Sequence, residues 1–274
     1  MASCPVCGGD TGPCERFQPE PFSQCERCGF IFRSDGAADA ASDTYTSGAY
    51  EETHAGYLMD FAGLSRAARV RLDYIAPWAS AGRLLDVGTA TGAFPFEASQ
   101  RGFRAEGIEP TPGFARVAGE RFNVKVSAVE LADYDFDGAP FAAITLWHVL
   151  EHLDEPVSQL ARLASMLAPD GIIAIEVPNA GGFSARRSGS AWPSLEPAVH
   201  INQFAPASLR TALETAGLRP AQIGTVAITP YLRPLDRLRP HHLVFRAQSL
   251  RALHTLSSEH PSGYELLRTV ATKA

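Results

Sequence analysis

The feature that most constrains this chain is an alternation of short apolar strands with amphipathic helices between residues 83 and 177. Strands are predicted at 83–87, 104–108, 124–126, 142–146 and 172–177, and helices at 94–101, 113–120 and 156–167. Parallel strands need a crossover of a dozen or more residues, which a helix usually supplies. The pattern therefore predicts an α/β fold with a doubly wound parallel sheet.

Less regular segments flank this alternation. Residues 34–44 are small and polar, which indicates a linker. Residues 56–76 have apolar residues at the spacing of a helix, and Pro77 and Gly82 end this predicted helix. After the alternation we expect a loop or lid at 181–198, a helix at 206–216, β-rich stretches at 222–229 and 243–247, an exposed excursion at 230–240 and a helical tail from residue 250. These boundaries predict three parts: 1–34, a linker and helical lid at 35–80, and a core at 81–274 with a lid insertion near 180–204.

Charge and hydropathy narrow the class of protein. Lysine plus arginine is 24 and aspartate plus glutamate is 30, which gives a net charge of −6. A negative chain disfavours a general nucleic-acid binder and a binder of anionic membranes. No apolar run is long enough for a transmembrane helix, and the first residues lack the pattern of a signal peptide, so we expect a cytoplasmic protein. The oligomeric state does not follow from the sequence.

All five cysteines fall within the first 28 residues. Cys4 and Cys7 form one C-x-x-C pair, and Cys25 and Cys28 form another after 17 intervening residues. This spacing is typical of a structural zinc site, in which four thiolates replace the core that about 30 residues cannot build. We therefore predict a zinc ribbon at 1–34, with a redox dithiol pair as the alternative and Cys14 as a spare thiol.

The segment 84–94 reads as a strand, a turn of small residues and the start of a helix. The dinucleotide pattern G-x-G-x-x-G needs glycine at 88, 90 and 93, and only Gly88 matches it. The pattern D/E-x-G-x-G-x-G is matched by Asp86, Gly88 and Gly92, and Ala90 departs from it. The turn lies at the carboxyl edge of the sheet, where a ligand can approach the backbone.

That second pattern resembles motif I of the class I S-adenosylmethionine-dependent methyltransferases. Glu109 follows the second strand about 20 positions further on, where a carboxylate can accept hydrogen bonds from ribose hydroxyls. The stretches 146–153, 176–179 and 200–204 are similar to the ubiquinone-biosynthesis-type branch of these enzymes. The resemblance covers roughly residues 45 to 220, and it implies a Rossmann-like methyltransferase sheet with S-adenosylmethionine as cofactor.

The resemblance also implies roles for single residues. Asp86 would serve the amino-acid end of the cofactor, Gly88 and Gly92 would form its turn, and Glu109 would hold the ribose. Further cofactor contacts are implied for Glu130 near the adenine, Leu146 and Trp147 at the sulfonium, and Tyr45 and Tyr50 at the methionine end.

A base is needed if the acceptor is a hydroxyl or a carbon acid, and imidazole titrates near neutral pH. The catalytic candidates are therefore His148, His152 and His200. His148 and His152 would share a face if their stretch is helical, and His200 lies in the lid segment. The alternative interpretation for each of the three is a histidine that has only a structural role, with its hydrogen bonds satisfied within the fold.

A zinc knuckle before such a core is similar in layout to the nucleotide-sugar C-methyltransferases, although this chain has no room for their large second α/β domain. We expect methyl transfer to a small-molecule acceptor, such as a natural product or a sugar-like intermediate. The alternatives are a non-catalytic zinc-ribbon or cofactor-binding scaffold, an NAD-dependent oxidoreductase, and methylation of RNA or protein. The sequence does not decide between O-, N- and C-methylation.

Overall fold

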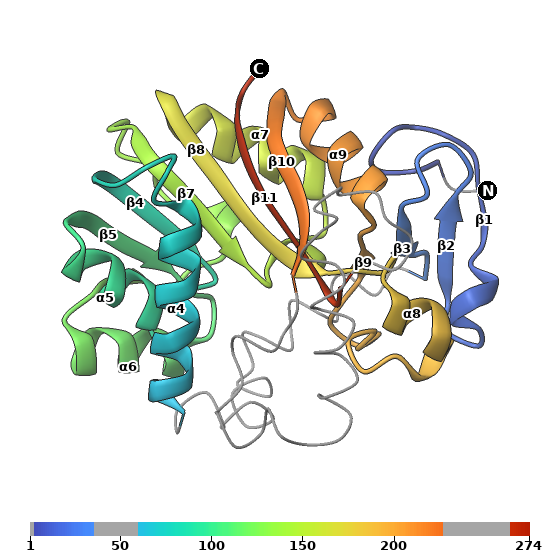
Figure 1. Cartoon of the computed structure of the whole chain (residues 1–274), viewed down its shortest axis with the longest axis horizontal. Coiled ribbons are helices and arrows are strands. Elements are labelled where there is room, and N and C mark those ends of the chain that lie inside the picture. The colour runs from blue at the N-terminus through green and yellow to red at the C-terminus, as the bar shows by residue number, and fades with distance from the viewer. Residues whose placement is uncertain (1–2, 36–59, 227–263) are drawn as a thin grey trace.

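A seven-stranded sheet forms the centre of the molecule (Figure 1). The computed structural model describes residues 3–35, 60–226 and 264–274. The strands of this sheet are β4 (Gly82–Val87), β5 (Phe103–Ile108), β6 (Lys125–Ser127), β7 (Phe141–Trp147), β8 (Leu167–Pro178), β10 (Leu218–Val226) and β11 (Leu266–Lys273). Their order across the sheet is β10-β11-β8-β7-β4-β5-β6.

The five strands from β4 to β8 pair in parallel, as the alternation predicts. Strand β11 pairs antiparallel with both β8 and β10, so the sheet is mixed rather than wholly parallel. The predicted helix in the tail is wrong where the structure describes it, because residues 266–273 form this strand. Leu267, Thr269 and Val270 are fully buried between two long partners, and this non-local pairing decides their conformation.

Helices cover both faces of the sheet. They are α4 (Phe61–Ile75), α5 (Ala93–Gln100), α6 (Pro112–Phe122), α7 (Pro156–Met166) and α9 (Pro206–Thr215). Helix α8 (Phe183–Ser188) instead packs Ala185 with Phe17 and Trp192 of other segments. Neighbouring strand residues face opposite sides, so Leu84 packs with α4 and α5 while Leu85 packs with α7 and α9. Burial on both faces explains why these strands are continuous apolar runs.

Residues 3–35 supply three strands of a second, smaller sheet beside the main one (Figure 1). Its strands are β1 (Thr11–Pro13), β2 (Phe22–Cys25), β3 (Ile31–Arg33) and β9 (Asn202–Gln203). The edge strand β9 therefore comes from the core, with Ile31 opposite Gln203 and Phe32 opposite Asn202. The N-terminal part and the segment after residue 200 share one hydrogen-bonded sheet.

One further segment differs from expectation. The segment predicted as a loop at 181–198 contains helix α8 and a short 3-10 helix, η4 (Gly189–Ala191). The predicted stretches 230–240 and 243–247 lie outside the described residues. In the described part of the chain, every helix is too short or too polar to span a bilayer.

Candidate active site and metal centre

The turn between β4 and α5 is held in a left-handed backbone conformation. Gly88, Ala90 and Gly92 have φ angles of +66°, +47° and +79°. A Cβ on Gly88 would lie 2.5 Å from Val149 Cγ2, and one on Gly92 would lie 2.6 Å from Ala118 Cβ. Glycine is therefore required at both positions for two reasons: each has a positive φ angle, and each lies too close to a neighbouring side chain to carry a Cβ. Ala90 departs from the motif yet keeps the left-handed conformation.

Glu109 connects this turn to the end of β5. Its Oε2 accepts a hydrogen bond from the Ala90 amide, and its Oε1 accepts one from the Thr111 amide, each at 2.8 Å. Burial raises the pKa of Glu109, although the two amides oppose that shift. Each carboxylate oxygen keeps a second acceptor position, because an ionised carboxylate has about four lone-pair sites.

Asp86 lies at the end of β4 and is 2% exposed. Its Oδ1 accepts a hydrogen bond of 2.6 Å from the Thr145 hydroxyl. Burial raises the pKa of Asp86 to about 7, and the hydrogen bond from Thr145 limits the shift. An acid held this way gains from a cationic partner, such as an ammonium group.

A cavity of about 630 Å³ opens at this edge of the sheet. The predicted site residues that line it are Asp86, Gly88, Glu109, Glu130, Trp147, His148, His152 and His200. Gly92 shapes the turn without lining the cavity. Leu146 does not line it either, because its side chain points to the opposite face of β7 and packs in the core with Leu85. Tyr45 and Tyr50 lie outside the described residues.

Trp147 lines the cavity and packs against neighbouring side chains. Its ring lies 5.3 Å from that of Phe94, and the Arg71 guanidinium lies 5.1 Å from its centroid. Its buried Nε1 has no hydrogen-bond partner within the described ranges. A buried donor of this kind is costly unless a ligand or water satisfies it, which fits a polar ligand in the cavity.

His148 follows β7 in a left-handed conformation with φ of +61°. Its Nδ1 lies 3.3 Å from Glu151 Oε1, and its Nε2 lies 3.4 Å from Glu176 Oε1. Burial alone would lower the pKa of His148, but these two carboxylates raise it to about 9. At neutral pH the imidazole is therefore protonated in this arrangement.

Glu176 is the centre of a buried ionic network that sequence reasoning missed. Arg71 Nη2 from α4 lies 2.6 Å from Glu176 Oε1, and the Arg268 guanidinium from β11 donates to Oε2. Burial would raise the pKa of Glu176, but the two guanidinium groups and His148 hold it well below its usual range. An acid inside an apolar strand signals buried cationic partners, although it does not identify them.

The predicted helical face for His148 and His152 is wrong. Residues 150–152 form a short 3-10 helix, η3 (Leu150–His152), and the left-handed His148 precedes it. His152 instead pairs edge-to-face with His200, at 4.7 Å between ring centroids. Burial lowers the pKa of His152 to about 4, although Glu151 opposes that shift.

Backbone contacts fix the orientation of both rings. His152 Nδ1 lies 2.9 Å from the carbonyl of Val199, and His200 Nδ1 lies 2.9 Å from that of Ser194. A carbonyl oxygen can only accept, so each Nδ1 carries a proton when the ring is neutral. The second nitrogen, Nε2, is then the basic one in both rings.

Two amide side chains of β9 hold the surrounding loops together. Asn202 Nδ2 donates to the carbonyls of Leu150 and Leu153, at 3.4 and 2.6 Å, on either side of η3. Gln203 Nε2 donates to the carbonyls of Leu195 and His200, at 2.9 and 3.1 Å. Because β9 pairs with β3, the N-terminal sheet supports this wall of the cavity.

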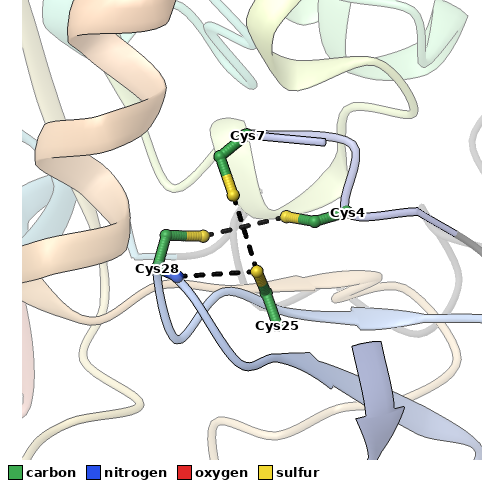
Figure 2. Close-up of side chains that lie close together, drawn as sticks. All are labelled: Cys4, Cys7, Cys25 and Cys28. Atoms are coloured by element: carbon green, nitrogen blue, oxygen red, sulfur yellow. Dashed lines mark hydrogen bonds between the residues drawn. The ribbon is translucent and has the colours of Figure 1, made fainter. Parts of the chain in front are cut away.

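Four cysteines come together at one end of the N-terminal sheet (Figure 2). The Sγ atoms of Cys4 and Cys28 are 3.7 Å apart, and those of Cys7 and Cys25 are 3.5 Å apart. Tetrahedral Zn²⁺ with bonds of about 2.3 Å would place its sulfurs roughly 3.8 Å apart, so the donor set and spacing fit zinc. Cys14 lies apart from them, buried with Phe17 and Trp192.

Comparison with known proteins agrees with this architecture. A family model described as a methyltransferase domain matches residues 62–223. The ubiquinone biosynthesis O-methyltransferase of Xylella fastidiosa strain M23 is 31% identical over 121 residues, which are 40% of this chain and 48% of that protein. The biotin biosynthesis bifunctional protein BioHC of Cellvibrio japonicus is 28% identical over 165 residues, 58% of this chain and 32% of that protein. These alignments span half or less of each relative.

Solved structures share the fold at low sequence identity. The plantazolicin methyltransferase BpumL, solved with S-adenosylhomocysteine, aligns with a TM-score of 0.58 and 14% identity, over 86% of this chain and 95% of its own. A Burkholderia thailandensis 1,6-didemethyltoxoflavin-N1-methyltransferase aligns with a TM-score of 0.56 and 17% identity, over 86% and 88% of the two chains.

The fold and the turn after β4 define an enzyme class, the S-adenosylmethionine-dependent methyltransferases of Rossmann-like architecture. Since the family model covers more than half of the sequence, this chain belongs to the methyltransferase domain family.

Proposed function

We propose that this protein transfers a methyl group from S-adenosylmethionine to a small-molecule acceptor by in-line displacement. One observation carries the proposal: the acidic ends of β4 and β5 line the same cavity as His148, His152 and His200. Displacement at a sulfonium methyl needs the donor and the nucleophile aligned in one enclosed space. Positioning of this kind supplies much of the rate enhancement in such reactions.

The cofactor would occupy the end of the cavity beside β4 and β5. Asp86 would bind the ammonium group of the cofactor, and the free acceptor positions of Glu109 would bind the ribose hydroxyls. The left-handed turn at Gly88 lets the backbone approach the ligand, and Glu130 would border the adenine. When bound, S-adenosylmethionine supplies an electrophilic methyl group, which the wall at Trp147 would shield from water.

The acceptor would occupy the end beside the three histidines. His152 or His200 would take a proton from the attacking group, because His148 is already protonated at neutral pH. Support for a small acceptor comes from the fold neighbour solved with both 1,6-didemethyltoxoflavin and S-adenosylhomocysteine. Whether the acceptor carries a sugar, as in the nucleotide-sugar enzymes, stays a prediction. At the N-terminal sheet, Cys4, Cys7, Cys25 and Cys28 would hold a structural zinc ion, and a closed four-thiolate site leaves no position for a substrate.

Calorimetric titration with S-adenosylhomocysteine tests the proposal directly. We expect binding to the whole chain, no binding of NAD, and transfer of labelled methyl from S-adenosylmethionine to at least one member of a panel of hydroxyl, amine and carbon-acid acceptors. Absence of S-adenosylhomocysteine binding would refute the proposal. Binding without transfer to any acceptor would favour the scaffold alternative.

A further inference from the structure

Three metal-ligating side chains meet at the acceptor end of the cavity. Glu151 and His152 belong to η3, and His200 lies directly before Ile201 and β9, in a segment nearly 50 residues away in sequence. One ligand atom from each lies within 4.8 Å of the other two. Two imidazoles and one carboxylate form a donor set that proteins use for zinc and for non-haem iron.

Both histidines are oriented as metal ligands usually are. A ligating histidine commonly donates its other ring nitrogen to a backbone carbonyl, which fixes the tautomer and the ring. His152 and His200 each place Nδ1 at 2.9 Å from such a carbonyl. Nε2 is thereby the nitrogen that each ring offers to the shared space between them.

Glu151 is the second, independent observation. Its side chain is 1% exposed, and its Oε1 lies 3.3 Å from His148 Nδ1. Its buried Oε2 has no hydrogen-bond partner in the described ranges. A buried carboxylate oxygen without a hydrogen-bond donor is costly, and a bound cation relieves that cost.

The site is also held in place before any ligand arrives. Asn202 donates hydrogen bonds to the carbonyls of Leu150 and Leu153, on either side of Glu151 and His152. Gln203 donates hydrogen bonds to the carbonyls of Leu195 and His200. Both amides belong to β9, so the backbones that carry the three ligands are tied to one short strand. Such support is what a preformed metal site needs.

We propose that Glu151, His152 and His200 bind a divalent cation, of the Zn²⁺, Co²⁺ or Mn²⁺ type, at the acceptor end of the cavity. Three protein ligands leave positions open toward the cavity, which His152 and His200 line. An acceptor hydroxyl fits an open position, and its coordinated oxygen loses its proton more readily. This role rests on the proposed methyl transfer, whereas binding of the cation does not.

The chemistry balances without a redox partner. The acceptor O–H bond breaks and its proton leaves to solvent, while the oxygen keeps the electron pair. That pair forms the new O–CH₃ bond as the S–CH₃ bond breaks, and the sulfonium becomes the neutral thioether of S-adenosylhomocysteine. The metal keeps its oxidation state. With the cation bound, His152 and His200 act as its ligands, and the cation takes over the role given above to a histidine base.

The test uses the whole chain loaded with one equivalent of Zn²⁺, so that the four cysteines are filled first. Co²⁺ is then titrated and followed by calorimetry and by visible absorption. We expect one further equivalent to bind, with ligand-field absorption and without sulfur-to-cobalt charge transfer. Glu151→Gln and His200→Ala should weaken this binding by roughly 100-fold or more, since loss of an outer partner alone costs about 10–100-fold. Glu155→Gln, on the exposed neighbour of η3, should leave it unchanged.

The proposal is overturned if zinc-loaded wild-type protein takes up no second Co²⁺ ion, or if the second ion shows sulfur ligation. It is equally overturned if Glu151→Gln and His200→Ala, each verified as folded by circular dichroism, bind the ion as the wild type does. Titration of the same samples with S-adenosylhomocysteine separates the two proposals, because metal uptake without cofactor binding would remove the methyltransferase function and leave the metal site.

Discussion

The two ends of the cavity are built in different ways. The proposed cofactor end comes from one continuous segment, in which Asp86 lies at the end of β4 and Glu109 and Glu130 follow β5 and β6. The acceptor end combines Arg71 from α4, the turn after β7, and His200 beside the N-terminal sheet. The first end is therefore a property of local strand–turn–helix units, and the second is a property of the assembled tertiary structure.

Loss of the four-cysteine site should give the largest effect and should separate the two ends. Cys28→Ser should remove zinc and unfold the N-terminal sheet, since zinc-dependent folding of small domains involves about 10–16 kcal/mol. The N-terminal sheet joins the core through the pairing of β3 with β9, which lies at the acceptor end, so we expect binding of S-adenosylhomocysteine to persist. Zinc content, limited proteolysis and calorimetry measure these outcomes.

Cys14→Ser is the matched control, because Cys14 lies outside the cluster and should leave the zinc content unchanged. If Cys28→Ser abolished cofactor binding while its core stayed folded, the two ends would be coupled and the comparison would fail.

The next largest effect is expected at the cofactor end. Glu109→Gln replaces an acceptor of two amide hydrogen bonds by a group with only one acceptor oxygen. We expect affinity for S-adenosylhomocysteine to fall roughly 10- to 100-fold, because hydrogen bonds to charged groups contribute about 1.5–3 kcal/mol. The exposed Glu120→Gln on α6 is the control in the same calorimetric assay. Equal affinities for both variants would remove Glu109 from the site.

A smaller effect is expected from pH. Asp86 has its pKa raised to about 7, so below pH 7 its proton must leave before an ammonium group can bind. Affinity for S-adenosylhomocysteine should therefore fall as pH falls, by up to about tenfold per unit. The same pKa shift has the opposite effect on folding. Because the pKa of Asp86 is raised in the folded state, its contribution to the stability of the fold is complete below pH 3.8 and declines as pH rises toward 7.

Asp86→Asn is the control for this pH dependence. The variant should bind more weakly at pH 8 and should lose the slope between pH 6 and 7. A slope that survives unchanged in Asp86→Asn would assign it to another group.

The smallest effect concerns the turn itself. Gly88→Ala places a Cβ 2.5 Å from Val149 at a positive φ, and strain of this kind costs about 1–3 kcal/mol. Gly119→Ala, on the exposed side of α6 with open space around it, should instead stabilise the protein by about 0.5–1 kcal/mol. Denaturant unfolding compares the two variants, and equal stabilities would mean that the turn tolerates a side chain.

The sequence predicts the strands and helices around Asp86 and Glu109 well because their signals are local. The strands at 83–87, 104–108 and 142–146, and the helices between them, lie within a residue or two of their predicted places. Both faces of each strand are buried, so a continuous apolar run marks a strand whatever lies beside it. The placement of Asp86 and Glu109 at neighbouring strand ends follows directly from that pattern.

The acceptor end could not be predicted in the same way. Glu176 is visible as an acid in an apolar strand, but its partner Arg268 lies on a strand that the sequence suggested as a helix. The pairing of His152 with His200 depends on a 3-10 turn and a left-handed residue, neither of which has a sequence period. Long-range pairing, rather than local propensity, decides these contacts.

The pairing of β9 with the N-terminal sheet has a consequence for the folding of the protein during synthesis and for truncated fragments. The segment that carries the four cysteines is synthesised before the core, yet its strand β3 gains its second hydrogen-bonding neighbour, β9, only after residue 203 has been synthesised. Phe30 also covers Phe204, at 5.1 Å between ring centroids. A fragment without residues 3–35 would therefore expose the Phe204 ring and the unpaired edge of β9. An exposed strand edge next to an apolar side chain promotes aggregation, so we expect such a fragment to aggregate during expression.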